Sequence, residues 1–282
     1  MDKTSQISKT GSLISGGIAG CIARTCTSPL EVIKTLKQTT DSSSKSFSQC
    51  FRNIYQTEGI RGYFRGNGTY LIRTLPYSAI QFLTFEQTNN YLTNNNYFNK
   101  NARYLLSGAS AGFTSLTFTY PLEVIRTRLT IQSRLNPEYT GITNACTKIV
   151  KTEGIKGLFK GYTMSCMGFI PYLTINFYTF NYLKDYTNPT GNTLINLVNG
   201  SAAGTAAISI MYPSDLIRRK LQVNKEHNIG IFKTVKNIYK INGIRGFYSG
   251  YFTGIAKVTP QSGITFMVYE LCKKYIIENK VI

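Results

Sequence analysis

Three acid–base pairs recur at fixed distances from a proline in this chain of 282 residues. In each copy an acidic residue stands two positions after the proline, and a basic residue stands three positions after the acid. The copies are Pro29, Glu31 and Lys34; Pro121, Glu123 and Arg126; and Pro213, Asp215 and Arg218. Charged side chains in apolar surroundings are costly unless they find a partner of opposite charge. The spacing therefore predicts ion pairs among these six side chains.

The pairs belong to a threefold internal repeat, because the three prolines are separated by 92 residues each time. Three further motifs recur in the same order: a glycine pair, a glycine-rich turn, and a proline followed by aromatic residues. Their copies are Gly16/Gly20, Gly108/Gly112 and Gly200/Gly204; EGIRGYFRG, EGIKGLFKG and NGIRGFYSG; and PYSAIQFLTFE, PYLTINFYTFN and PQSGITFMVYE. This pattern predicts three copies of one unit. We place the copies at 12–97, 98–191 and 192–282, after an N-terminal tail at 1–11, and expect one domain.

Each repeat is predicted to consist of a helix, a basic loop and a second helix. The six helices are expected at 12–38, 67–88, 104–132, 162–184, 195–222 and 251–273. All have about the length needed to cross a bilayer core of about 30 Å, and the glycine pairs favour close approach of helix backbones. The mean hydropathy of −0.12 is low for a membrane protein. Ser, Thr, Gly and occasional charges account for it if the helices line a wet cavity. We therefore predict an all-α membrane protein with six transmembrane helices.

The distribution of charge predicts the orientation and the partners. The net charge is +19, which favours anionic partners. The loops at 39–65, 134–160 and 223–249 hold 14 Lys and Arg residues, whereas the loops between repeats hold only Lys100. The positive-inside rule places the basic loops on one side and both termini on the other. Because the charge lies on matched loops beside apolar segments, nucleic acid is not an expected partner.

Catalysis and metal binding find little support in the sequence. The six cysteines form no CxxC pair, and the chain has a single histidine, His227. No nucleophile–base pair or glycine-rich phosphate loop occurs in the required context. We therefore expect neither an enzyme, nor a metal site, nor a cofactor.

Three proline-kinked helices related by threefold symmetry bring the acids and bases to one level, where the acid of one repeat can pair with the base of the next. The motif Pro-x-(Asp/Glu)-x-x-(Lys/Arg) in three repeats of about a hundred residues resembles that of the mitochondrial carrier family across essentially the whole chain. The resemblance implies a monomeric six-helix barrel in the inner mitochondrial membrane, with termini in the intermembrane space and a short matrix-side helix in each basic loop. It also implies alternating access around one central site, with the acid–base ring as the matrix gate.

The resemblance further assigns residues that support the two gates. Family matrix gates carry a glutamine nine residues after the proline; Gln38 and Gln222 match, whereas Thr130 does not. The cytoplasmic gate of the family is an aromatic residue, an acid and then a base on the even-numbered helix of each repeat. Only Tyr269, Glu270 and Lys273 complete it; Glu86 lacks its base and Lys184 lacks its acid. We expect a cytoplasmic gate weaker than the matrix gate.

Positions that break the threefold symmetry are candidates for substrate recognition. Three residues before each even-helix proline stand Arg73, Gly168 and Lys257, and Phe169 follows the glycine. Two cations bind phosphate or carboxylate, while the glycine leaves a flat slot for a ring. Arg24 is a further cation, because its counterparts are Leu116 and Ile208.

These positions coincide with the substrate contact points of the family, and they resemble those of the branch that carries adenine nucleotides and coenzyme A. ARTCTSPLE resembles ATP-Mg/phosphate carriers, and GFIPYLTINFYTF resembles coenzyme A and adenosine-phosphosulfate carriers. The segment KVTPQSGITFMVYE also resembles thiamine pyrophosphate carriers. A carrier of another phosphorylated cofactor is therefore one alternative, and a carrier-fold receptor or scaffold that does not transport is another.

The turns before the even helices are predicted to hold a lipid. They carry Arg65–Gly66 and Lys160–Gly161, whereas Ser249 replaces the cation before Gly250. Backbone N–H groups at a helix start beside a cation suit a phosphate. In the family these positions hold cardiolipin, and we expect the third site to be the weakest.

Overall fold

The computed structural model describes residues 9–40, 46–95, 98–133, 135, 137–187, 193–225 and 230–279. Within these ranges the chain is helical, and no strand occurs. Most of the expected tail at 1–11 lies outside the described residues, as do the positions at which the first and second repeats were expected to end.

The first repeat contains a divided helix, a short helix, a 3-10 turn and a long helix. They are α1 (Lys9–Cys26), α2 (Ser28–Thr39), α3 (Phe47–Glu58), η2 (Ile60–Phe64) and α4 (Asn67–Asn94). The second repeat has α5 (Lys100–Ile131), α6 (Ile142–Glu153), η3 (Ile155–Phe159) and α7 (Tyr162–Thr187). The third has α8 (Thr193–Val223), α9 (Ile231–Asn242), η4 (Ile244–Tyr248) and α10 (Tyr251–Asn279). The predicted helix–loop–helix unit is therefore present three times, with a short helix in each basic loop.

The first repeat differs from the others at its proline. Pro121 and Pro213 lie inside continuous helices, whereas Pro29 lies in the first turn of α2, after a break at Thr27. The Thr27 hydroxyl donates back to the Ala23 carbonyl at 2.9 Å. Ser28 stands where the other repeats have tyrosine, and its short side chain donates to the Tyr63 carbonyl at 2.9 Å. The sequence pattern predicted a kinked helix here. The structure divides it at Thr27, while the N–H groups of Thr27 and Glu31 still donate to the Ala23 and Thr27 carbonyls.

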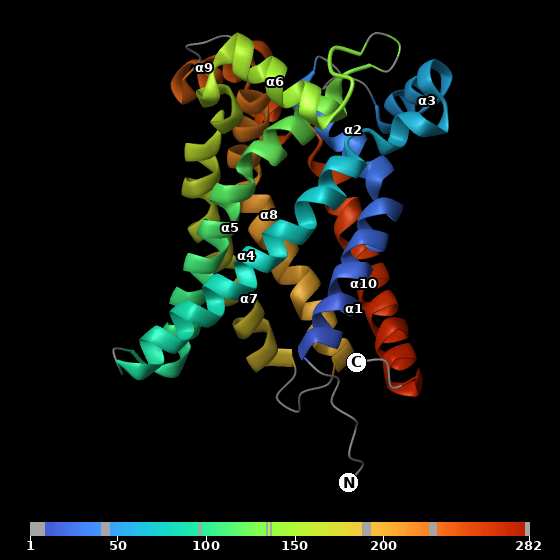
Figure 1. Ribbon diagram of the computed structural model, residues 1–282. Helices are drawn as coiled ribbons and strands as arrows, with labels where there is room; N and C mark the ends of the chain where they lie inside the picture. The colour runs from blue at the N-terminus through green and yellow to red at the C-terminus, as the bar shows by residue number, and fades with distance from the viewer. Residues whose placement is uncertain are drawn as a thin grey trace.

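The repeats join into a ring through contacts between neighbouring repeats. α4 packs against α5, α7 against α8, and α10 returns to α1. Figure 1 shows the short helices α3, α6 and α9 at one end, with the start of α1 and the end of α10 at the opposite end. Toward that opposite end, the α4/α5 pair and the α1/α10 pair move apart from each other (Figure 1).

Each short helix anchors the end of the long helix that carries the acid–base motif. In α6, Ala145 and Ile149 are four residues apart and therefore share one face, which is buried against Ile125 of α5. In α3, Ile54 packs in the same way against Ile33 of α2. These small apolar clusters fix the ends of α2, α5 and α8, and so position the charged side chains one or two turns earlier.

None of the described helices combines the length and the apolar character by which a membrane span is recognised. The close approach of helices at the glycine pairs is also largely absent. A Cβ atom added at Gly16, Gly20, Gly108 or Gly204 would meet nothing within 4 Å. At Gly112 the ring of Phe169 occupies the space that a Cβ would need, and a Cβ on Gly200 would lie 4.0 Å from the ring of Phe180.

Candidate functional site

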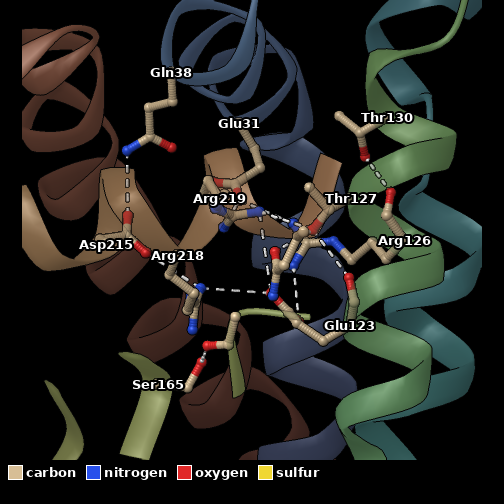
Figure 2. A network of polar contacts seen from close by, with 12 residues as sticks. Glu31, Gln38, Glu123, Arg126, Thr127, Thr130, Ser165, Asp215, Arg218 and Arg219 are labelled. Atoms are coloured by element: carbon tan, nitrogen blue, oxygen red, sulfur yellow. Dashed lines mark hydrogen bonds and ion pairs between the residues drawn. The ribbon is translucent and has the colours of Figure 1, made fainter. Parts of the chain in front are cut away.

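The structure brings the acids and bases of the three repeats together in one ring (Figure 2). The acid of each repeat faces the base of the next repeat, and the third repeat closes onto the first. The pairs are Glu31–Arg126 at 2.9 Å, Glu123–Arg218 at 3.6 Å and Asp215–Lys34 at 2.9 Å. Because their helices are held by the short helices behind them, these pairs join α2, α5 and α8 at one level.

Glu31 is the carboxylate of the ring with the largest number of close cationic partners. It is 4% exposed, and four cations contact it: Arg24 and Lys257 at 2.8 Å, Arg126 at 2.9 Å and Arg219 at 3.1 Å. A buried carboxylate loses its hydration, so these charge-assisted contacts must replace it. Glu31 thus connects three repeats at one point.

Glu123 and Asp215 have fewer close partners. Glu123 contacts Arg73 at 2.7 Å, and three ring cations lie between 3.6 and 4.0 Å from it. Asp215 contacts Lys34 at 2.9 Å and Arg218 at 3.2 Å, and its side chain is 27% exposed. The ring is therefore unequal, and its most accessible acid lies on α8.

Arg219 is a ring residue that the motif did not identify. It directly follows the base of the third repeat, is 5% exposed, and donates to Glu31 and Thr127 (Figure 2). Its counterparts in the first two repeats are Thr35 and Thr127. A comparison of every position of the motif, rather than only its recurring residues, would have revealed this cation.

The two predicted glutamines have different partners. The Gln38 amide donates to Asp215 at 3.2 Å, so it supports the Asp215–Lys34 pair (Figure 2). Gln222 accepts from Thr127 at 2.9 Å and donates to the Tyr120 hydroxyl at 3.1 Å. Thr130, which replaces the glutamine in the second repeat, donates to the carbonyl of Arg126 at 2.8 Å.

The cations predicted to bind substrate contact the ring. Arg73 is held by Glu123 and donates to Thr119, while Arg24 and Lys257 contact Glu31. Among the described residues, seven cationic side chains therefore surround three carboxylates. The cations are Arg24, Lys34, Arg73, Arg126, Arg218, Arg219 and Lys257. The cluster has an excess of four positive charges.

A pocket of about 300 Å³ lies beside this cluster. Its walls are mainly apolar and aromatic, with a few polar groups at one side. The lining residues are Lys34, Leu116, Met164, Ser165, Gly168, Phe169, Tyr172, Ile208, Met211, Tyr212, Ser214, Asp215 and Arg218. A Cβ on Gly168 would lie 3.2 Å from the Ser214 hydroxyl. The predicted slot at Gly168 is thus narrow, and Phe169 borders it while its ring tip rests on Gly112.

The residues predicted for the opposite gate stand apart from one another. Glu86, Lys184 and Glu270 are exposed and Lys273 is half-buried. In the part of the chain that the structure describes, none of these four forms an ion pair. The ring is therefore formed at one end of the molecule, while the four charged groups at the other end are unpaired.

The turns predicted to hold a lipid connect neighbouring repeats. Gly66, Gly161 and Gly250 have φ values of 70°, 79° and 80°. A Cβ on each would lie 2.9–3.2 Å from the carbonyl oxygen of a ring base in the next repeat: Arg126, Arg218 and Lys34 respectively. Both the backbone conformation and this close approach require glycine.

The cations beside these glycines point into the protein. Arg65 donates to the Gln132 carbonyl at 2.6 Å and Lys160 to the Asn224 carbonyl at 2.7 Å. Each acceptor lies at the end of the next repeat's long helix, where the helix dipole favours a cation. Ser249, in the third copy, donates to the Lys37 carbonyl at 2.7 Å.

A second charged cluster ties the ring helix α5 to its short helix. Arg128 is 2% exposed, forms two contacts with Glu153 and donates to the Gln222 carbonyl at 3.0 Å. Burial raises the pKa of Glu153, but hydrogen bonds from Arg128 and Lys160 outweigh burial and hold the pKa below its ordinary value. Glu153 therefore stays ionised and fixes the end of α6 to α5.

Replacing Gly66 with alanine is expected to lower the melting temperature of the purified protein. The left-handed conformation alone costs a non-glycine residue about 1–2 kcal/mol, and the new methyl group also meets Thr130 and the Arg126 carbonyl. Gly68→Ala is the matched control, because it lies in the first turn of α4 with nothing within 4 Å of its Cβ. Equal melting temperatures for the two variants would show that the contact of this turn with the next repeat does not require glycine.

Comparisons with known proteins agree with the repeat. A family model described as mitochondrial carrier protein matches residues 5–96, 98–191 and 189–280. The mitochondrial adenine nucleotide transporter ADNT1 of Arabidopsis thaliana is 33% identical, over 93% of this chain and 86% of its own. Solute carrier family 25 member 16 of Mus musculus is 34% identical, over 95% of this chain and 89% of its own length. Adenine nucleotide transporter BT1 of Zea mays, named as chloroplastic, amyloplastic and mitochondrial, is 35% identical, over 95% and 64%. This chain belongs to the mitochondrial carrier family.

Proposed function

We propose that this chain is a carrier of the inner mitochondrial membrane that moves a phosphorylated adenine-containing anion, coenzyme A or an adenine nucleotide, by alternating access. The observation that carries the proposal is the excess of four positive charges at the ring beside an apolar pocket. An excess of buried cations is costly unless an anion balances it. A phosphate-bearing substrate supplies that charge.

The pocket suits the other end of such a substrate. Met211 and Ile208 line it opposite the Gly168 slot, and apolar walls with a few polar groups are typical of sites for small molecules. The phosphates would lie toward Arg73 and Lys257, and the ring toward Gly168. Two of the relatives compared above are named as adenine nucleotide transporters, which supports the same class.

Contacts between the substrate cations and the ring suggest how binding drives transport. Arg73 now binds Glu123, and Lys257 binds Glu31. A phosphate that attracts these cations removes contacts from both ring acids. The substrate would then bind more tightly when the ring is open than when it is closed, which is the condition for a ligand to shift a conformational equilibrium. The ring is the matrix gate in this proposal, and its loosening opens the site to the matrix.

The proposal includes the membrane arrangement. The six spans are α1 with α2, α4, α5, α7, α8 and α10, in a monomer with both termini on the intermembrane-space side. The basic segments that contain α3, α6 and α9 then face the matrix, as the positive-inside rule requires. Residues Glu86, Lys184, Glu270 and Lys273 form the weaker cytoplasmic gate when the molecule opens to the matrix.

Cardiolipin is proposed to bind at the three turns before the even helices. The third turn borders a pocket of about 340 Å³ whose lining includes Lys37, Arg245 and Gly250. Two cations from other positions thus accompany the α10 helix start there, although Ser249 is uncharged. We therefore revise the order expected from the sequence, and no longer rank the third site as the weakest.

Binding measurements separate the proposed substrates from the alternatives. A ligand that binds the native state raises the melting temperature. The panel is ADP, ATP, coenzyme A, adenosine 3′,5′-bisphosphate, thiamine pyrophosphate, and adenosine as the uncharged control. We expect adenine compounds with phosphates to stabilise the protein and adenosine to leave it unchanged. A larger shift with thiamine pyrophosphate would favour the cofactor alternative, and no shift with any compound would favour a receptor or scaffold.

Replacing Gly168 with leucine is expected to remove the stabilisation by ADP but to retain that by pyrophosphate. The leucine side chain enters the pocket, whereas the cations that bind phosphate are untouched. Gly168→Ala is the graded control, because its Cβ meets Ser214 at 3.2 Å and Met211 at 3.7 Å and a small shift accommodates it. If Gly168→Leu weakens both ligands equally, the pocket does not hold the base.

A further inference from the structure

Ser214 breaks the threefold symmetry inside the pocket. It directly follows Pro213, and the residues at this position in the other repeats are Leu30 and Leu122. The Ser214 hydroxyl lies across the slot from Gly168, since a Cβ on Gly168 would be 3.2 Å from it. A polar group therefore stands at a position where the first two repeats carry an apolar one, and it faces the space that we assign to the substrate ring.

The Ser214 hydroxyl also lacks the partner that helical serines commonly find. Ser209 on the same helix donates to the Thr205 carbonyl at 2.7 Å, and Thr205 donates to the Ser201 carbonyl at 2.8 Å. No hydrogen bond within the described ranges involves the Ser214 side chain. It is free to donate to a ligand and to accept from one.

The other polar groups of the pocket are mostly engaged. Lys34 and Arg218 bind Asp215, and the Ser165 hydroxyl donates to Tyr120 at 3.2 Å. The hydroxyl of Tyr172 is the other lining hydroxyl without a described hydrogen bond. Tyr172 has a tyrosine counterpart, Tyr77, in the first repeat, so it is not specific to this wall of the pocket.

We propose that the Ser214 hydroxyl determines base specificity by hydrogen bonding to the polar edge of the purine that lies against Gly168. The inference rests on the proposed function. Burying the polar edge of a ring without a hydrogen-bond partner is unfavourable. The neighbouring lining side chains of α8, Ile208 and Met211, offer no such partner. A hydroxyl suits the six-position of adenine, because it accepts from the exocyclic amine and donates to the adjacent ring nitrogen.

The test compares ADP with purine riboside 5′-diphosphate, which lacks the exocyclic amine but keeps the ring and the phosphates. Dissociation constants are measured by thermal shift for wild type, Ser214→Ala and Tyr172→Phe. In wild type we expect ADP to bind about threefold to tenfold more tightly than the analogue. In Ser214→Ala this preference should fall close to one, because ADP loses more affinity than the analogue, which keeps only the adjacent ring nitrogen as a partner. Ser214→Leu, which installs the residue of the other repeats, should lose the preference as well.

Several results would overturn this inference while leaving the proposed function in place. They are an unchanged preference in Ser214→Ala, equal weakening of both ligands, or a preference that disappears in Tyr172→Phe instead. If the folded wild type binds neither diphosphate and no coenzyme A, the proposed function itself is wrong. Both the variant and the analogue are needed. The affinity lost with the Ser214 hydroxyl and the affinity lost with the exocyclic amine are non-additive only if these two groups interact.

Discussion

Replacing Glu31 with glutamine is expected to abolish transport and to lower the melting temperature. The substitution leaves four cations, Arg24, Arg126, Arg219 and Lys257, without the carboxylate that they share. Removing one partner from a buried ion cluster typically costs about 3–5 kcal/mol, because the remaining charges stay buried and unbalanced. The ring would then no longer close, and exchange requires both closed and open states. The measurements are uptake into liposomes and the melting temperature of the purified variant.

Two variants control for this experiment. Glu138→Gln removes an acid that pairs with Lys225 at 2.7 Å in an exposed loop, where an ion pair contributes about 0–1 kcal/mol. It should transport like wild type. Glu31→Asp keeps the charge on a shorter side chain and should recover part of both properties. Normal uptake by Glu31→Gln would mean that this ring is not a gate.

Replacing Arg73 or Lys257 with alanine is expected to reduce transport strongly with little effect on folding. Each acid that these cations contact keeps other partners, because Glu123 retains Arg126 and Arg218, while Glu31 retains Arg219 among others. The loss therefore falls on the substrate. A hydrogen bond to a charged group contributes about 1.5–3 kcal/mol, which corresponds to about a tenfold to hundredfold weaker binding.

Arg61→Ala is the matched control for these variants. Arg61 is an exposed cation on η2, away from the pocket, and its loss removes the same charge from the chain. Thermal stabilisation by ADP and uptake of labelled ADP should both fall in Arg73→Ala and Lys257→Ala, and remain in Arg61→Ala. If all three variants lose the same amount of activity, the effect is one of net charge rather than of a binding site.

Much of the architecture could be predicted because it repeats. Three copies of the acid–base motif at equal spacing specify both the number of units and the level at which the charges meet. The short helix in each basic loop was expected from the family resemblance, and the structure contains it. The division at Thr27 was not predicted; the contact of Ser28 with the Tyr63 carbonyl beside it joins two distant segments, which the repeat pattern does not specify.

The sequence did not indicate contacts that depend on the direction in which a single side chain points. Cardiolipin binding at Arg65 and Lys160 stays a prediction, but both side chains reach carbonyl groups of the next repeat, which no spacing within one repeat indicates. Arg219 was missed because it lies beside the repeating base and has threonine counterparts. At Gly16 and Gly204 the sequence indicated close helix contact, yet a Cβ added at either glycine would meet nothing within 4 Å.

In the proposed function, this chain exchanges an adenine-containing phosphate ester through the cationic site at the ring. Uptake of labelled ADP into liposomes that contain the purified protein tests it most directly, with internal ADP, internal coenzyme A or buffer alone. We expect saturable uptake that depends on an internal adenine compound and that excess unlabelled ADP, but not adenosine, suppresses. If protein that melts cooperatively and is stabilised by cardiolipin shows no uptake under any internal condition, this chain is not an exchanger of ADP.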